Sequence, residues 1–229
     1  MKIFFNIAPN KLKSIMKKTL LLLVLVSTNL IALAQYENAK QVFESPKLKE
    51  VIATHKTVAI LPFNTKISFK KQPKDFNLDA HIQKEKTMST SIQSSMYTFL
   101  LRKSSNYTVE FQDVEKTNIL LKKAGLLDKL DEFTKDEVAK ALGVDAVISG
   151  KFETEQTRSE AGAIVTTVLF GGLGSKTGSG SLTMVVNDGK TGDMQWRFFK
   201  AMNDGVFTSS DELIDRMMRK VSRNFPYSK

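Results

Sequence analysis

Short apolar runs alternate with polar, glycine-containing segments along the chain, and the period of each run predicts one element. Residues 57–63 are apolar and rich in β-branched side chains, and they include Pro62, which has no backbone N–H for a sheet. This composition predicts a buried strand, the first strand of the core. Further along, apolar residues recur at steps of three and four and predict a helix over about 82–103 that covers the sheet. These residues are Met88, Ile92, Met96, Phe99 and Leu100.

The next segment predicts a half-buried strand and a short helix. Apolar and polar residues alternate over 107–111, which is typical of a strand with one face in the core. Asp113 is suited to cap a helix that contains the apolar residues 119–121, and Gly125 is suited to its left-handed C-terminal turn.

A second short helix and a series of strands follow. Thr134 and Glu137 have the spacing of a capping box, and Gly143 is expected to end that helix. Apolar strands with glycine-containing turns between them predict an antiparallel meander. Its expected members are residues 145–152, 160–170, 180–188 and 193–201.

The C-terminal segment predicts a final amphipathic helix. Ser209 and Glu212 repeat the capping-box spacing, and apolar residues recur at helical steps as far as Phe225. The expected fold class is therefore α/β, with a single mixed, largely antiparallel sheet and helices mainly on one face.

Residues 1–34 have the pattern of an N-terminal extension followed by a secretory signal. Lys17 and Lys18 precede the apolar run 20–26, and Ala32 and Ala34 fit the small-residue cleavage motif before position 35. A retained membrane anchor is the alternative, although the apolar run is shorter than the roughly 20 residues that span a bilayer. We expect a cleaved leader at 1–34, a polar lead-in at 35–55 and one α/β domain at 56–229.

Composition changes this picture in two respects. Loss of residues 1–34 removes five lysines and no acidic residue, so the formal charge falls from +10 to +5. The chain contains no cysteine, so neither a disulfide nor an acylated cysteine is available, and we expect that the protein is not a lipoprotein. Lys66, Lys70, Lys71 and Lys74 concentrate charge in the segment 64–74. This segment is either a solvated loop or a surface that meets phosphates or an acidic protein.

Three segments together resemble a group of bacterial envelope proteins. They are VAILPF at 58–63, ALGVDAVISG at 141–150 and DGKTG at 188–192, which is followed closely by Trp196. In this order they resemble the α/β domain of the curli assembly protein CsgG, shared with the amino-terminal domain of TolB and the outer-membrane activators of penicillin-binding proteins. The resemblance implies a non-enzymatic role in envelope assembly, secretion or cell-wall regulation, exercised through protein contacts. Gly150 is expected to leave room for a crossing element, and Trp196 either packs in the core or anchors an interface.

No catalytic or cofactor motif emerges. The segment GGLGSKTG at 171–178 lacks the spacing of a phosphate-binding loop, because serine precedes Lys176. His55 and His81 are 26 residues apart, without a ligand-spaced carboxylate cluster. We therefore expect no enzyme activity, cofactor or metal.

The remaining candidate is the hairpin 163–186, which either enters a membrane or partner or sits in the core. Phe170, Leu173 and Lys176 are its predicted partner contacts, beside the four lysines above. We expect a periplasmic or secreted protein that binds other envelope proteins and no nucleic acid. Peripheral outer-membrane association, homo-oligomer formation and an oligomeric pore built from the 163–186 hairpin are left open.

Overall fold

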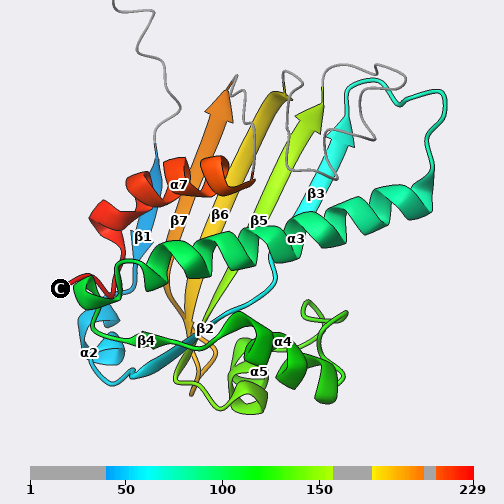
Figure 1. The fold of residues 1–229 in the computed structure, drawn as a ribbon. Helices are drawn as coiled ribbons and strands as arrows, with labels where there is room; N and C mark the ends of the chain where they lie inside the picture. Colours follow the sequence, from blue (N-terminus) through cyan, green and yellow to red (C-terminus); the bar gives the residue numbers. More distant parts are fainter. Residues whose placement is uncertain (1–39, 157–176, 204–209) are drawn as a thin grey trace, which may run out of the picture. The chain divides into compact units, whose positions relative to one another are not determined.

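The computed structural model describes residues 40–156, 177–203 and 210–229, in which seven strands form one mixed sheet (Figure 1). The order is β1-β7-β6-β5-β2-β4, and β3 pairs with β5 beyond the end of β2. The strands are β1 (Gln41–Glu44), β2 (Thr57–Ile60), β3 (Asn64–Phe69), β4 (Glu110–Phe111), β5 (Ala146–Gln156), β6 (Thr177–Asp188) and β7 (Met194–Asn203).

The long ladders of the sheet are antiparallel. β5, β6 and β7 pair consecutively, and β1 joins the free side of β7, all antiparallel. β2 and β3 run parallel to β5, and β4 runs parallel to β2. The predicted α/β class and the meander over 180–188 and 193–201 are therefore confirmed, whereas the predicted strand 160–170 lies outside the described residues.

Two long helices cover one face of the sheet, α3 (Leu78–Leu101) and α7 (Ser210–Val221). The short helices α4 (Val114–Lys123) and α5 (Lys135–Leu142) pack on the other face, near β2. Alternation along β2 explains this division, because Ile60 joins the cluster under α3 while its neighbour Ala59 joins the cluster under α4 and α5. Helix α2 (Leu48–Ile52) and two 3-10 turns, at Ser104–Asn106 and Ser222–Asn224, complete the described elements.

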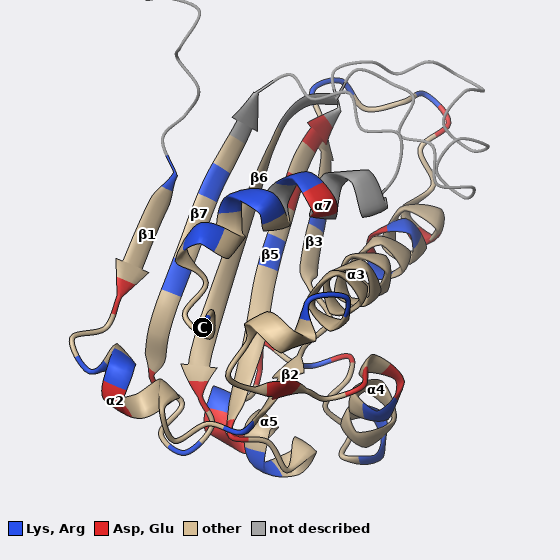
Figure 2. Cartoon of the chain, turned by 60° about the vertical axis from the view of Figure 1, so that its left-hand side comes forward, with Lys and Arg blue, Asp and Glu red and all other residues tan. Residues whose placement is uncertain are grey.

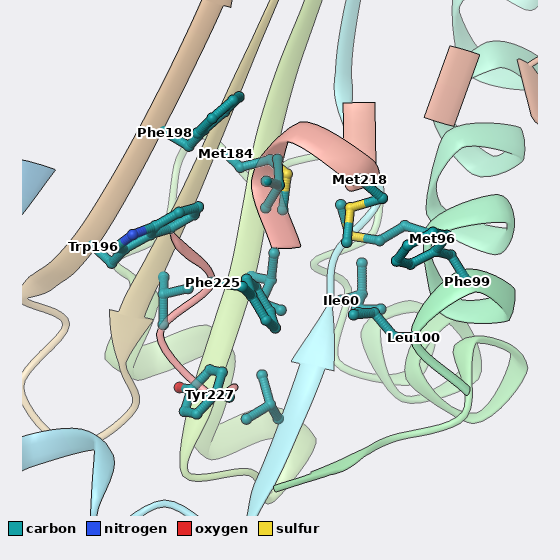
Figure 3. Packing of buried hydrophobic residues seen from close by; sticks show 14 of the residues in the cluster. Ile60, Met96, Phe99, Leu100, Met184, Trp196, Phe198, Met218, Phe225 and Tyr227 are labelled. Atoms are coloured by element: carbon teal, nitrogen blue, oxygen red, sulfur yellow. The ribbon is translucent and has the colours of Figure 1, made fainter. Parts of the chain in front are cut away.

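Large side chains from the sheet, from α3 and from the C-terminal segment fill the main core (Figure 3). Trp196 is fully buried, and its ring stacks on Phe198 with 6.1 Å between centroids and meets Phe225 edge to face. Of the two interpretations of Trp196, core packing is therefore correct. Gly150 also behaves as expected, because a Cβ there would overlap the ring of Phe63.

The predicted caps of α4 and α5 are confirmed, whereas Ser209 of the predicted third cap lies outside the described residues. Asp113 accepts the backbone N–H of Lys116, and Thr134 and Glu137 form the capping box of α5. Gly143 ends α5 with φ at +66°. The helix expected at 82–103 starts four residues earlier, at Leu78, because Asn77 accepts the N–H of Ala80 and caps it.

Three expectations need correction. The lead-in 35–55 contains strand β1 as well as a short helix, because residues 41–44 pair with the edge of β7. The expected lysine-rich loop 64–74 begins as strand β3, so Lys66 lies on a strand. Phe225 lies beyond the end of α7, after a 3-10 turn, and still enters the core. Residues Asn38–Lys229 form one compact unit, and cleavage after residue 34 stays a prediction.

Candidate functional site

The four predicted contact lysines are all exposed and lie near one end of the sheet. Lys66 is on β3, and Lys70, Lys71 and Lys74 are in the connection from β3 to α3. Figure 2 shows this connection with its basic positions in blue, at the outer end of α3. The other predicted contacts, Phe170, Leu173 and Lys176, lie outside the described residues, so their role stays a prediction.

Aromatic packing fixes both ends of this connection. The rings of Phe69, Phe76 and His81 form a cluster with centroid distances of 5.2–6.0 Å. Glu85 of α3 also connects the helix to β3, because its Oε1 accepts the N–H of Ile67 at 2.7 Å. The same oxygen lies 3.3 Å from His81 Nε2. Among the described strands, β3 pairs only with β5, so its other side is an edge of the sheet. Glu85 accepts a backbone N–H on that edge, which a further strand would otherwise bond.

Two aliphatic side chains are exposed beside the lysines. Leu78 is 60% exposed and Ile82 is 43% exposed, on successive turns at the start of α3. We call the set Lys66, Lys70, Lys71, Lys74, Leu78 and Ile82 the basic tip. Sequence reasoning found its lysines and missed its aliphatic part, because the helix was expected to begin at 82.

A second surface lies on the sheet face that points away from α3 and α7. Phe43 of β1 is opposite Arg197 of β7, which is opposite Val185 of β6, so the three form one row across the strands. Phe199 follows on the same side of β7, and the Arg197 guanidinium carbon lies 5.8 Å from its ring centroid. Phe43 is 46% exposed and the other three are half-buried. We call Phe43, Val185, Arg197 and Phe199 the open-face patch.

The open-face patch could not be found from sequence. Residues 194–199 contain apolar side chains at four of six positions, so the alternation that assigns Trp196 inward and Arg197 outward is weak. Phe43 joins the patch only through the pairing of β1 with β7. That pairing depends on contacts more than 150 residues apart in the chain.

A buried polar network ties the C-terminus to the β6–β7 turn. His55 Nε2 lies 3.0 Å from Asp188 Oδ1, and His55 Nδ1 lies 2.8 Å from the Tyr227 hydroxyl. The other oxygen of Asp188 accepts the backbone N–H and the hydroxyl of Thr191, at 2.8 and 2.9 Å. Burial by itself would raise the pKa of Asp188, but the hydrogen bonds from His55 and Thr191 hold that pKa below its ordinary value.

This network is buried and connects three separate segments of the fold. Tyr227 is fully buried, and burial together with the charge of Asp188 raises the pKa of its hydroxyl. Its carbonyl accepts the N–H of Thr108 at 2.9 Å, so the C-terminal segment is fixed at several points. Sequence reasoning placed Asp188 at the end of the strand 180–188 and did not connect it with His55, because the two are 133 residues apart.

Two further searches concern the described residues alone. In residues 40–156, 177–203 and 210–229, no three acidic or histidine side chains gather as a metal site would require. No helix in these ranges combines the length and the apolar character needed to cross a bilayer.

Comparisons with known proteins give similarities of fold only. No protein-family model matches the chain, and no curated protein matches it. It is similar to the crystal structure of lipoprotein GNA1162 from Neisseria meningitidis, with 12% identity, a TM-score of 0.45 and coverage of 73% of this chain and 96% of that one. A PelC dodecamer from Paraburkholderia phytofirmans has 14% identity, a TM-score of 0.40 and coverage of 84% and 100%. The LpoB C-terminal domain from Salmonella enterica has 11% identity, a TM-score of 0.34 and coverage of 69% and 94%.

At these identities and TM-scores the three structures carry no argument about function. They also do not identify a family, so the specific resemblance to CsgG and TolB stays a prediction.

Proposed function

We propose that this protein is an exported, non-enzymatic component of the bacterial cell envelope that binds other envelope proteins through the open-face patch. The leader at 1–34 supports export, and the resemblance carried by 58–63, 141–150 and 188–192 supports a role in envelope assembly, secretion or cell-wall regulation. The observation that carries protein binding is the row of Phe43, Arg197 and Val185 across three paired strands.

The chemistry of the patch specifies a partner. Aromatic residues and arginine are enriched at protein interfaces and among the residues that dominate their binding energy. Arg197 is the single charged side chain of the patch, and its stacking on Phe199 holds the guanidinium in place. The expected partner surface therefore presents a carboxylate between apolar side chains, so that the guanidinium is paired when water is excluded.

Site-specific photocrosslinking tests the position of this surface. A photoreactive phenylalanine at position 43 is expected to crosslink a defined protein in native envelopes. The matched control is position 119 on α4, where Ile119 has the same degree of exposure, 47% against 46%, outside the patch. Equal crosslinking from both positions would argue against the patch.

Direct binding then decides the mechanism. The captured protein, once purified, is expected to bind the wild-type chain and to lose binding to Arg197→Glu by at least about a hundredfold, as for a central charged contact. Lys116→Glu, a charge reversal at an exposed position on α4, is the control and should leave binding unchanged. Undiminished binding of Arg197→Glu would refute the proposal.

A second candidate function is an oligomeric pore subunit that uses the 163–186 hairpin. It is favoured by the β5–β6 ladder, which stays paired as far as Gln156 and Thr177, so the two strands enter the connecting segment side by side. Deletion of 170–176 tests the predicted contacts at Phe170, Leu173 and Lys176 without removing β6. Ring assembly in detergent that the deletion abolishes would support the pore, and a monomer in detergent would reject it.

A further inference from the structure

The basic tip carries an excess of positive charge on an exposed segment. Residues 66–74 contain four lysines and no acidic residue, and each of the lysines is exposed. The only acidic side chains in the remainder of the connection and the first turn of α3 are those of Asp75 and Asp79, which are also exposed. Within this stretch of the chain lysines outnumber carboxylates two to one, while across the sheet Lys66 lies opposite Glu153 of β5.

The same surface exposes apolar side chains in the part of the chain that the structure describes. Leu78 and Ile82 are 60% and 43% exposed, and their i, i+4 spacing places them on one face of α3. They are two of the six large apolar side chains exposed in the described residues, and they are the two that accompany the lysines. Burial of these side chains would provide binding energy that lysines alone do not.

The conformation of the basic tip is fixed by contacts within the protein. The Phe69–Phe76–His81 cluster fixes the connection at both ends, and Asn77 fixes the start of α3. In Figure 1 the connection projects outward from the end of β3 before it returns into α3. Binding would therefore require little ordering of the backbone.

The combination favours a lipid surface over a protein. Lysine is depleted in protein interfaces, whereas lysine clusters beside exposed aliphatic side chains are typical of proteins that bind the interface of anionic membranes. A layer of phosphate headgroups can adapt to a projecting surface and pair with each lysine separately.

We infer that the basic tip is a membrane-contact site, at which the four lysines bind anionic phosphate headgroups while Leu78 and Ile82 enter the interface. Membrane binding at the tip is independent of the protein that the open-face patch binds, because none of the residues is shared. It gives a physical basis to the peripheral membrane association that the sequence left open.

Cosedimentation of the purified protein with vesicles tests this inference. The vesicles are phosphatidylcholine with or without phosphatidylglycerol. Binding is expected only to the anionic vesicles, and it should weaken as salt shortens the screening length from about 10 Å at 0.1 M to about 3 Å at 1 M. Inorganic phosphate and polyglutamate, as competitors, distinguish the membrane from a free anion or an acidic polypeptide.

Two tip variants and two matched controls separate the contributions. Exchange of the four tip lysines to glutamine is expected to weaken vesicle binding by a hundredfold or more, since each lysine at an anionic surface contributes roughly fivefold. Leu78→Ser with Ile82→Ser is expected to weaken it about thirtyfold. One control variant exchanges four exposed lysines of α4 and α5 to glutamine, and the other carries Ile119→Ser on α4. Each control variant should bind the vesicles as tightly as the wild type does. The control lysines are Lys116, Lys122, Lys123 and Lys140.

The outcomes are distinct. Loss of vesicle binding in the two tip variants but not in the controls, with unchanged unfolding midpoints, supports the membrane-contact site. Equal loss of vesicle binding in the tip and control lysine variants would show that binding depends on net charge alone, and it would overturn the membrane-contact site. Binding to polyglutamate without binding to vesicles would assign the tip to an acidic protein and also overturn it.

Discussion

Substitution of Asp188 by asparagine is the sharpest test of the buried network. The carboxylate accepts from His55 Nε2 at 3.0 Å on one oxygen and from the N–H and hydroxyl of Thr191 on the other. Asparagine keeps the shape but replaces one acceptor oxygen by an NH₂ group, which then faces a donor. Buried hydrogen bonds to a charged group contribute about 1.5–3 kcal/mol, so we expect D188N to lower the free energy of unfolding by about 2 kcal/mol. For a protein of this size, that corresponds to a fall in Tm of about 4–8 °C.

The pH dependence gives this prediction its specificity. The folded state holds the pKa of Asp188 below its ordinary value of 3.8, so folding favours the carboxylate. Its contribution is present above the unfolded pKa of about 3.9 and is lost as pH falls through the lower folded pKa. The difference in unfolding free energy between wild type and D188N should therefore shrink as pH falls below about 4.

Urea unfolding followed by tryptophan fluorescence measures the difference directly. Trp196 is the one tryptophan of the chain, and it is fully buried in the main core. Asp193→Asn, at an exposed position of the same turn, is the matched control and should change the unfolding free energy by less than about 0.5 kcal/mol. A D188N variant as stable as wild type, or a difference as large at pH 3 as at pH 7, would refute the reasoning.

Three further substitutions follow from buried contacts, each measured by the same urea unfolding. Gly150→Ala forces a methyl group against the ring of Phe63 and should cost about 1–3 kcal/mol, part of which Phe63→Leu should restore; full stability of the single variant would contradict the close packing. Tyr227→Phe leaves a histidine nitrogen unpaired and should cost about 1–2 kcal/mol, with a non-additive effect in combination with D188N; strict additivity would mean that the network does not act as one unit. Gln93→Leu removes the donor 2.7 Å from the Ile60 carbonyl and should cost about 1–3 kcal/mol; unchanged stability would contradict a stabilising role of this hydrogen bond.

Strong local patterns predicted the long elements and the capped ends of α4 and α5. The apolar spacing of α3, the caps of α4 and α5 and the apolar strands at 57–63 and 145–152 all depend on residues close in sequence. Side-chain period and capping act within one or two helical turns, so they can be read without knowledge of the fold.

Short strands escaped sequence reasoning for the opposite reason. β1 has four residues and β3 has six, and neither has an apolar run that would identify it. Each is a strand because an edge is available, on β7 for β1 and on β5 for β3. Their backbone hydrogen bonds come from partners far away in the sequence, and local propensity does not contain that information.

By itself, the sequence predicted an export signal, which stays a prediction, and it determined the α/β class, the caps of α4 and α5 and the position of the four lysines. Tertiary structure alone decided that Leu78 and Ile82 would be exposed beside those lysines, that Phe43 would meet Arg197, and that His55 would lie between Asp188 and Tyr227. Local sequence sets the type of an element through its period, whereas strand register and packing set which side chains become neighbours. Surfaces and networks depend on those neighbours, and so they appear only when the chain is folded.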